Sequence, residues 1–251
     1  MTRRLLFIFA HPDDESFAVA GLSRIYADAG ARIALVTATR GDAGRAGEPA
    51  LCGRDELPAR REAELREAAR ILGIGHVTLL DYRDRHLADA PPAEIRRELI
   101  GQIRRHRPQV VVTFDPNGAN LHPDHIAISR FAADAVAAAA DARWHPDAGP
   151  AHRVARLLWV PPVMPWEMPD VPDLAKAPGV DFLIDTSAYR EVKAAALRAH
   201  RTQHVSIDRH FFNLPAVDRI LSVEAFRQAF GPALSKTPAA DVFESIVEGH
   251  R

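Results

Sequence analysis

The sequence contains two short clusters of histidines and acidic residues that could hold a metal ion and activate water. The first is AHPDDE at residues 10–15, and the second is HPDH at residues 122–125. A catalytic zinc takes about three nitrogen or oxygen ligands from the protein and leaves one position for water. His11, Asp14 and His125 can supply these three ligands. The clusters therefore predict metal-assisted hydrolysis.

The remaining polar residues of the clusters can act on the reacting groups. Asp13, which this assignment leaves off the metal, can take a proton from the bound water. His122 can polarise a carbonyl or protonate a leaving nitrogen, and Asp124 can hold His122 in one tautomer. Either Asp13 or His122 could return the proton to the leaving nitrogen. We expect Asp13, His122 and Asp124 to be catalytic residues.

Short apolar segments alternate with segments of helical periodicity, and this order must position the clusters. Predicted strands cover residues 5–10, 32–39, 76–80, 110–114 and 154–160, and predicted helices cover residues 16–29, 58–72, 92–106 and 123–140. Such alternation is typical of a mostly parallel sheet with helices on both faces. We predict an α/β fold, a Rossmann-like three-layer sandwich with a small C-terminal cap.

The first and the fourth predicted strands each end at one of the clusters. In the common strand order 3-2-1-4-5 these strands are neighbours at the point where the order reverses, which is where doubly wound sheets bind ligands. Both clusters would then open into one crevice. Helix capping by Asp13 or Asp14 could explain the first cluster alone, but it does not explain the paired histidines. The acidic first turn also argues against a dinucleotide-dependent oxidoreductase.

Prolines crowd the segment that follows the fifth predicted strand, at positions 161, 162, 165, 169, 172 and 178. Regular structure is not expected there. We predict a catalytic domain over residues 1–160 and, over residues 161–251, a cap that packs on it. The cap would have a strand at 180–184, a helix at 188–200 and a C-terminal tail of short elements. Four large apolar residues could form a lid, although core packing is their more common role: Trp159, Met164, Trp166 and Met168.

The composition restricts the partners. Lys and Arg together number 32 and Asp and Glu 33, so no net charge attracts nucleic acid or a membrane surface. The single cysteine, Cys52, excludes an internal disulfide and a thiolate metal cage, which indicates a reducing compartment. No segment approaches the roughly 20 apolar residues of a transmembrane helix. We expect a cytoplasmic protein with a small-molecule substrate. The sequence does not decide whether the protein forms a homo-oligomer.

The order of these motifs resembles the PIG-L/LmbE-like family of zinc-dependent N-acetylglucosaminyl deacetylases. Beyond the two clusters, similar segments lie at residues 39–44, 61–65, 81–84, 115–118 and 193–203. The resemblance implies that His11, Asp14 and His125 bind zinc. It also implies that Asp13 is the general base and that His122 stabilises the tetrahedral oxyanion.

The resemblance further implies that Arg61 and Asp84 hold sugar hydroxyls. Their alternatives are a surface pair between Arg61 and Glu64, and a solvated carboxylate at Asp84. His200 and Gln203 also belong to a segment that is similar to the family, but the resemblance implies no chemical role for them. Residues 119–121 lack the tyrosine of members related to mycothiol biosynthesis, so the mycothiol substrate itself is not implied.

We therefore predict a zinc-dependent hydrolase that removes an N-acyl group, acetyl by resemblance, from an N-acetylglucosamine-type amino sugar. An amidase of thiol-sugar conjugates and a tailoring deacetylase of a secondary metabolite would use the same chemistry. A metal- and sugar-binding protein without turnover is a more distant alternative. Two histidines and one aspartate also accept other divalent metals such as Fe2+.

Overall fold

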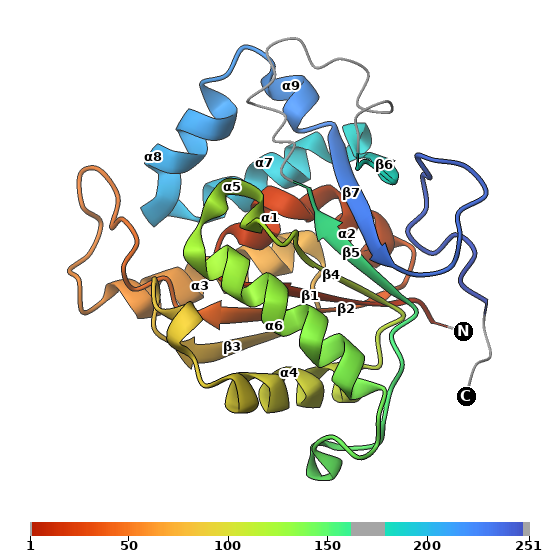
Figure 1. Cartoon of the computed structure of the whole chain (residues 1–251). Helices are drawn as coiled ribbons and strands as arrows, with labels where there is room; N and C mark the ends of the chain where they lie inside the picture. The colour runs from red at the N-terminus through yellow and green to blue at the C-terminus, as the bar shows by residue number, and fades with distance from the viewer. Residues whose placement is uncertain (1, 162–178, 248–251) are drawn as a thin grey trace.

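The computed structural model describes residues 2–161 and 179–247, and one sheet runs through this part of the chain (Figure 1). Its strands are β1 (Arg4–Phe9), β2 (Arg32–Thr39), β3 (His76–Tyr82), β4 (Val110–Phe114), β5 (Arg156–Val160), β6 (Phe182–Asp185) and β7 (Val223–Phe230). The strand order is β3-β2-β1-β4-β5-β7-β6. Strands β1 to β5 are parallel, and β7 is antiparallel to both of its neighbours.

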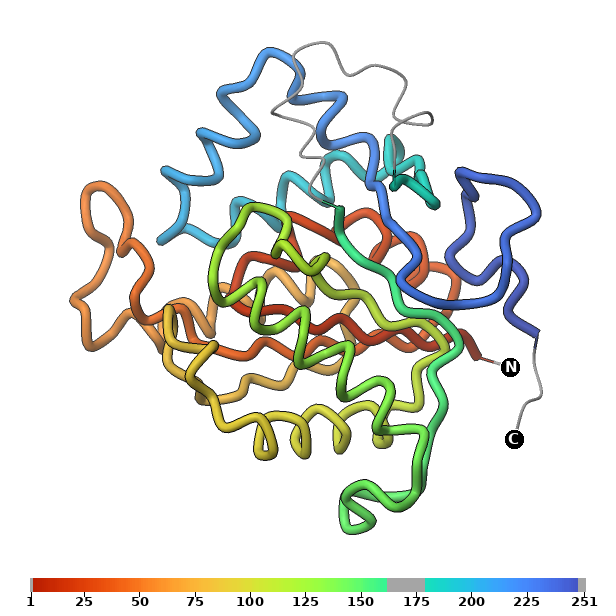
Figure 2. The backbone as a smooth tube through the Cα atoms, viewed as in Figure 1, coloured from red at the N-terminus to blue at the C-terminus, as the bar shows by residue number. Residues whose placement is uncertain are grey.

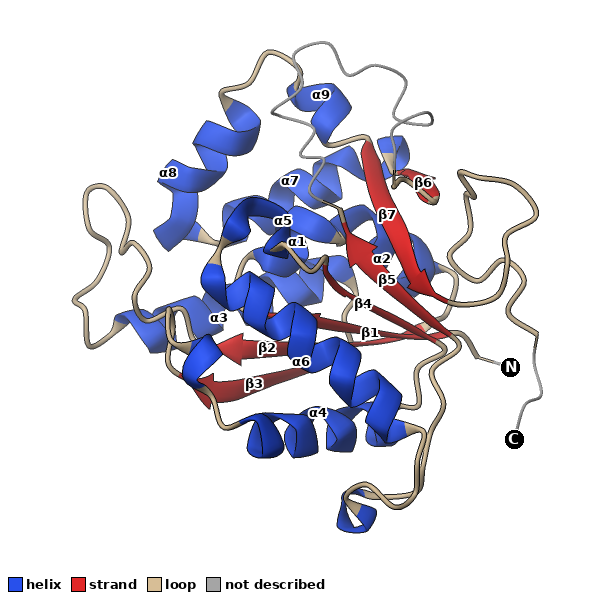
Figure 3. Ribbon diagram, in the orientation of Figure 1, coloured by secondary structure: helices blue, strands red, loops and turns tan. Residues whose placement is uncertain are grey.

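Helices cover both faces of the sheet. They are α1 (Asp14–Ala18), α2 (Ala20–Asp28), α3 (Leu57–Leu72), α4 (Pro92–His106), α5 (Gly118–Leu121), α6 (Pro123–Ala139), α7 (Arg190–Ala199), α8 (His204–Ile207) and α9 (Val217–Ile220). Helices α4 and α6 pack together on one face, and α2, α3 and α7 pack together on the other (Figure 3). This arrangement confirms the predicted three-layer α/β fold. Within the described residues, no helix has the length and apolar character needed to cross a membrane.

The central strands are apolar on both sides because helices cover both faces of the sheet. The side chains of β4 are all buried, as are those of β1 after Arg4 and of β2 after Arg32. Strand β1 pairs with β2 on one side and with β4 on the other, as the predicted order 3-2-1-4-5 requires. The reversal of strand order therefore lies between β1 and β4, whose ends carry the two clusters.

The C-terminal part extends the same sheet. We expected only short elements after residue 200, but β7 is a strand of 8 residues inserted between β5 and β6. The expectation was wrong for β7 because its apolar residues do not follow its burial: Glu224 is buried and Phe230 is exposed, and the strand is defined by its pairing with β5. Trp159 lies on β5 with the Arg227 guanidinium 6.0 Å from its ring. The other expected lid residues, Met164, Trp166 and Met168, lie outside the described residues.

The first predicted helix is divided into α1 and α2 at Val19, which has φ −137° and ψ 18°. The division leaves a second helix N-terminus, where the backbone N–H groups of Gly21 and Leu22 donate to Glu224 at 2.9 and 2.8 Å. Glu224 comes from β7 and also pairs with Lys193 of α7 at 2.9 Å. A break supported by such long-range contacts cannot be read from local periodicity.

Candidate metal centre and active site

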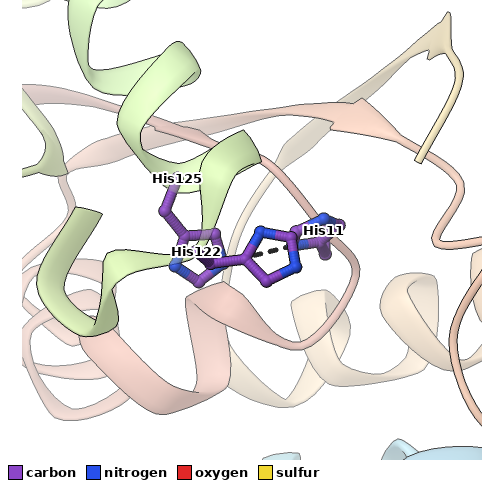
Figure 4. Close-up of side chains that lie close together, drawn as sticks. All are labelled: His11, His122 and His125. Atoms are coloured by element: carbon purple, nitrogen blue, oxygen red, sulfur yellow. Dashed lines mark hydrogen bonds between the residues drawn. The ribbon is translucent and has the colours of Figure 1, made fainter. Parts of the chain in front are cut away.

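The two clusters meet at the edge of the sheet where β1 and β4 end. His11 follows β1, whereas His122 and His125 lie at the start of α6, and their three rings gather in one place (Figure 4). Nδ1 of His11 lies 3.2 Å from Nε2 of His125. The His11 and His122 ring centroids are 4.8 Å apart. Both clusters therefore contribute histidines to the sheet edge predicted from strand order.

The carboxylate of Asp14 faces these two histidines, each with a different oxygen. Its Oδ1 lies 3.3 Å from Nε2 of His125, and its Oδ2 lies 3.7 Å from Nδ1 of His11. Backbone N–H groups of Ala10 and His11 hold Oδ2 at 3.1 and 2.8 Å. Ligand atoms bound to tetrahedral zinc at about 2.0–2.1 Å are separated by roughly 3.3 Å. The two histidine nitrogens lie near this separation from different oxygens of Asp14.

His122 lies beside the same two rings. Two groups of described residues could hold a metal ion, one of His11, His122 and His125 and the other of His11, Asp84 and Asp124. Its Nδ1 accepts the backbone N–H of Asp124 at 3.2 Å, which leaves the proton of the neutral ring on Nε2. Burial lowers the pKa of His122, and the nearby His11 and His125 lower it further. A neutral ring with a free N–H suits a hydrogen-bond donor to a developing oxyanion.

We expected the carboxylate of Asp124 to hold His122, but it does not. It is fully buried and accepts Nε2 of His11 at 3.1 Å and the backbone N–H groups of Arg85 and Leu87 at 2.6 and 3.1 Å. The reason is the position of His122 as the cap of α6, which brings only the backbone N–H of Asp124 to the His122 ring. Asp124 therefore fixes the His122 tautomer through its main chain and orients His11 through its side chain.

Asp84, in the loop after β3, faces the same nitrogen of His11. Its Oδ1 lies 3.2 Å from Nε2 of His11, and its Oδ2 accepts the N–H of Ala43 at 3.0 Å. Burial alone would lower the pKa of His11, but the hydrogen bonds to Asp124 and Asp84 raise it to about 10. The two carboxylates thus select which ring nitrogen of His11 faces His125.

Asp13 occupies an unusual backbone conformation at the start of α1. Its φ of 116° lies in the left-handed region, which costs a residue other than glycine about 1–3 kcal/mol. Its carbonyl accepts the N–H groups of Ser16 and Phe17, and its own N–H donates to Oε2 of Glu15 at 3.1 Å. Burial raises the pKa of Asp13 to about 6, although the Arg61 guanidinium acts in the opposite direction. A carboxyl that titrates near neutral pH suits a general base.

Arg61 of α3 is buried and makes its hydrogen bonds to the protein's own loops. Nη2 donates to Oδ2 of Asp13 at 3.0 Å and to the carbonyl of Pro12, and Nη1 donates to the carbonyl of Gly41 at 2.9 Å. Gly41 has a φ of +66°, and a Cβ atom there would lie 1.9 Å from Nη1. The glycine is therefore needed for Arg61 to reach Asp13.

Glu15 and His200 form a contact with Asp13 to which the sequence assigned no role. Both side chains are fully buried, and Nε2 of His200 lies 2.7 Å from Oε1 of Glu15. Burial opposes protonation of His200, but the Glu15 carboxylate outweighs it and raises the His200 pKa. Glu15 stands within the first cluster, and His200 within a segment of the resemblance. In the sequence, only these two positions indicated that Glu15 and His200 belong to the site.

The segment after α7 also attaches to α3 and to the loop after β2. Glu64 of α3 accepts the N–H and the hydroxyl of Thr202 at 3.1 and 2.7 Å, and its described ion pair is with Arg60 and not with Arg61. Gln203 donates to the carbonyl of Arg45 at 2.7 Å. Residue 45 belongs to the loop of residues 40–56, which projects from the end of β2 toward α8 (Figure 2). Gln203 therefore anchors this loop beside the site.

Comparison with known proteins gives consistent matches. The profile of the PIG-L family, described as GlcNAc-PI de-N-acetylase, matches residues 6–136. A protein of Streptomyces griseus subsp. griseus, named 1D-myo-inositol 2-acetamido-2-deoxy-alpha-D-glucopyranoside deacetylase, is 36% identical over 253 residues. That match covers 84% of this chain and 78% of the relative.

Solved structures share the fold. The crystal structure of a conserved protein from Thermus thermophilus is 30% identical with a TM-score of 0.69, and the match covers 91% of this chain and 95% of the other. The N,N'-diacetylchitobiose deacetylase of Pyrococcus horikoshii is 23% identical with a TM-score of 0.70, and the match covers 90% and 83%. At that identity the likeness concerns the fold alone.

Proposed function

The chain belongs to the PIG-L family and is an amide hydrolase of the deacetylase type, and we propose that it removes the acetyl group of an N-acetylglucosamine conjugate with the aid of zinc. The observation that carries the proposal is the close approach of His11, Asp14 and His125. Nδ1 of His11 lies 3.2 Å from Nε2 of His125, and Oδ2 and Oδ1 of Asp14 lie 3.7 and 3.3 Å from these two nitrogens, close to ligand separations around tetrahedral zinc. Two imidazoles and one carboxylate also accept Fe2+, so the metal used in the cell is part of the proposal.

Zinc bound there would supply a Lewis acid that lowers the pKa of a water molecule toward about 7. The chain's own contribution to the proton transfer is Asp13. Arg61 holds its Oδ2, and within the described residues no hydrogen bond engages its Oδ1. Oδ1 is therefore available to take a proton from the attacking water. With a pKa of about 6, Asp13 is ionised at neutral pH and acidic enough, once protonated, to return the proton to the leaving nitrogen.

His122 would donate its Nε2–H to the acyl oxygen as negative charge develops. Its Nδ1 is engaged by the N–H of Asp124, and its lowered pKa keeps the ring neutral. The ring therefore offers a hydrogen bond and does not act as the acid. This arrangement favours Asp13 over His122 as the residue that protonates the leaving nitrogen.

The substrate is proposed from the relatives. The Streptomyces griseus protein is named for a GlcNAc-inositol, and a Bacillus anthracis protein that is 40% identical over 136 residues is named a probable N-acetyl-alpha-D-glucosaminyl L-malate deacetylase. Sugar binding by Arg61 and Asp84 remains a prediction, and their described hydrogen bonds go to the protein itself. A cytoplasmic location, inferred from the single Cys52, also remains a prediction.

A substrate panel tests the proposal. Zinc-loaded protein would be incubated with GlcNAc-inositol, GlcNAc-malate, N,N'-diacetylchitobiose and, as a non-sugar amide, N-acetylalanine, and the release of primary amine would be measured. We expect turnover of at least one sugar conjugate and none of N-acetylalanine. Turnover of N-acetylalanine alone would contradict the proposed substrate class. The Asp13→Asn variant controls for contaminating deacetylases.

A further inference from the structure

We propose that His200 is a positioning residue for the general base Asp13 and acts through the carboxylate of Glu15. The inference rests on the proposed function, because Asp13 is a general base only if this site hydrolyses amides. It extends that function to the end of α7, where His200 follows Ala199. His200 would not touch the substrate or the metal.

Glu15 joins the two residues through both of its oxygens. Oε2 accepts the backbone N–H of Asp13 at 3.1 Å, while Oε1 accepts Nε2–H of His200 at 2.7 Å and the hydroxyl of Ser16 at 2.6 Å. The side chains of Glu15, Ser16 and His200 belong to residues with 0% exposure. Water therefore has no access to replace His200 as a donor to Glu15.

Asp13 needs such support because its backbone is strained. At φ 116° the residue keeps its conformation only when its surroundings hold it. Arg61 holds its side chain, and the first turn of α1 holds its carbonyl oxygen. The carboxylate of Glu15 accepts the backbone N–H of Asp13. The carboxylate of Glu15 thus completes the set of contacts that direct Asp13 toward the site.

His200 in turn fixes the position of Glu15. Helix α7 packs against α1 and α3, so the ring is carried by a firmly packed element. Within the described residues Nδ1 of His200 has no hydrogen-bond partner, and its polar contacts are those of Nε2 with Glu15 and Ser16. The donor at Nε2 is therefore the feature that distinguishes a positioning role from simple packing.

Two substitutions separate these roles. His200→Gln keeps an N–H near the position of Nε2, whereas His200→Met fills a similar volume without a donor. We expect both variants to bind one equivalent of zinc. We expect His200→Gln to keep kcat near the wild-type value, and His200→Met to lower kcat about 10- to 100-fold with KM unchanged. His204→Met, at the partly buried first residue of α8, is the matched control.

A second measurement does not depend on activity. Hydrogen–deuterium exchange of a peptide covering residues 10–17, in zinc-free protein, should be faster in His200→Met than in wild type and unchanged in His200→Gln. Glu15→Gln, whose amide nitrogen cannot accept the Asp13 N–H while its oxygen faces His200, should resemble His200→Met in both measurements.

The outcomes separate the inference from the function on which it rests. Wild-type kcat and exchange in His200→Met, or equal loss in the Gln and Met variants, would overturn the positioning role while the deacetylase activity of the wild type stands. Absence of deacetylase activity in zinc-loaded wild type would instead contradict the proposed function. If His200→Met does not fold, Glu15→Gln and His200→Gln decide by the same comparison.

Discussion

His11 and His125 bring Nδ1 and Nε2 to within 3.2 Å although 114 positions separate them in the chain. The adjacency of β1 and β4 produces this approach, because each histidine follows the end of one of these strands. Two carboxylates behind His11 then turn Nδ1 toward His125. The strand order thus brings two of the proposed metal ligands together.

Removal of a ligand should abolish tight zinc binding. We expect wild type to retain one equivalent of zinc after dialysis, and His11→Ala to retain almost none, since the remaining two donors do not complete the site. His122→Ala should keep its zinc. Metal content by mass spectrometry checks this, with the exposed His86→Ala as control. Zinc loss in His122→Ala but not in Asp14→Ala would mean that His122, and not Asp14, binds the metal.

Removal of the base should separate binding from turnover. Asp13→Asn should keep one equivalent of zinc but lower kcat by about 100- to 10,000-fold, since the amide cannot accept a proton. Steady-state kinetics with a titrated metal content measures both properties. Asp134→Asn, which removes an aspartate of α6 that pairs with Arg96, is the control. Unreduced kcat in Asp13→Asn would remove Asp13 from the base role.

The pH profile should reflect the ionisation of Asp13. The base works when ionised, so kcat/KM should rise with pH through an acid limb at or below about 6, because a bound cation can only lower the Asp13 pKa further. Arg61→Met removes the guanidinium that lowers this pKa, so the limb should move to higher pH. Arg70→Met, on the exposed side of α3, should leave the limb in place. A limb that moves to lower pH in Arg61→Met would contradict this relationship.

The support behind His11 should affect metal affinity. In Asp124→Asn the side chain can no longer offer two acceptor oxygens to His11 and to the N–H groups of Arg85 and Leu87. We expect zinc affinity about 10- to 100-fold weaker, as for other groups that orient metal ligands. Competition with a chromogenic chelator measures it. An unchanged affinity would show that Asp124 does not position His11.

The C-terminal strand should depend on one buried ion pair. Lys193→Met leaves the Glu224 carboxylate buried without its cation, and we expect a loss of about 3–5 kcal/mol in the free energy of unfolding. Urea unfolding of the zinc-free protein measures it. The exposed Lys236→Met should change stability by less than about 0.5 kcal/mol. A similar small change in Lys193→Met would mean that the two N–H groups at the start of α2 suffice to hold Glu224.

Much of the catalytic half could be predicted from the sequence because its signals are local. The buried strands are continuous apolar segments, and both clusters follow strand ends, so strand order alone placed His11 beside His125. The partners of Arg61 and Asp84 could not be predicted in this way. Whether these residues face a sugar or the protein depends on loops whose course is set by contacts with Gly41 and Ala43.

Contacts between residues that are far apart in the chain could not be predicted from the sequence for a related reason. Strand β7 is only partly buried and its apolar residues do not alternate with polar ones, so its pairing with β5 defines it. The same pairing brings Glu224 to the start of α2 and explains the break at Val19. His200 and Glu15 are separated by 185 positions, and only the packing of α7 brings them into contact. No local pattern reports such a contact.

The most direct test of the account is acetate release from GlcNAc-inositol by metal-stripped protein, before and after the addition of one equivalent of zinc. We expect no release before addition. In wild type, but not in His11→Ala, release should grow with zinc until one equivalent is bound. Equal release by stripped and zinc-loaded protein, or by His11→Ala and wild type, would contradict a metal-dependent deacetylase centred on His11, Asp14 and His125.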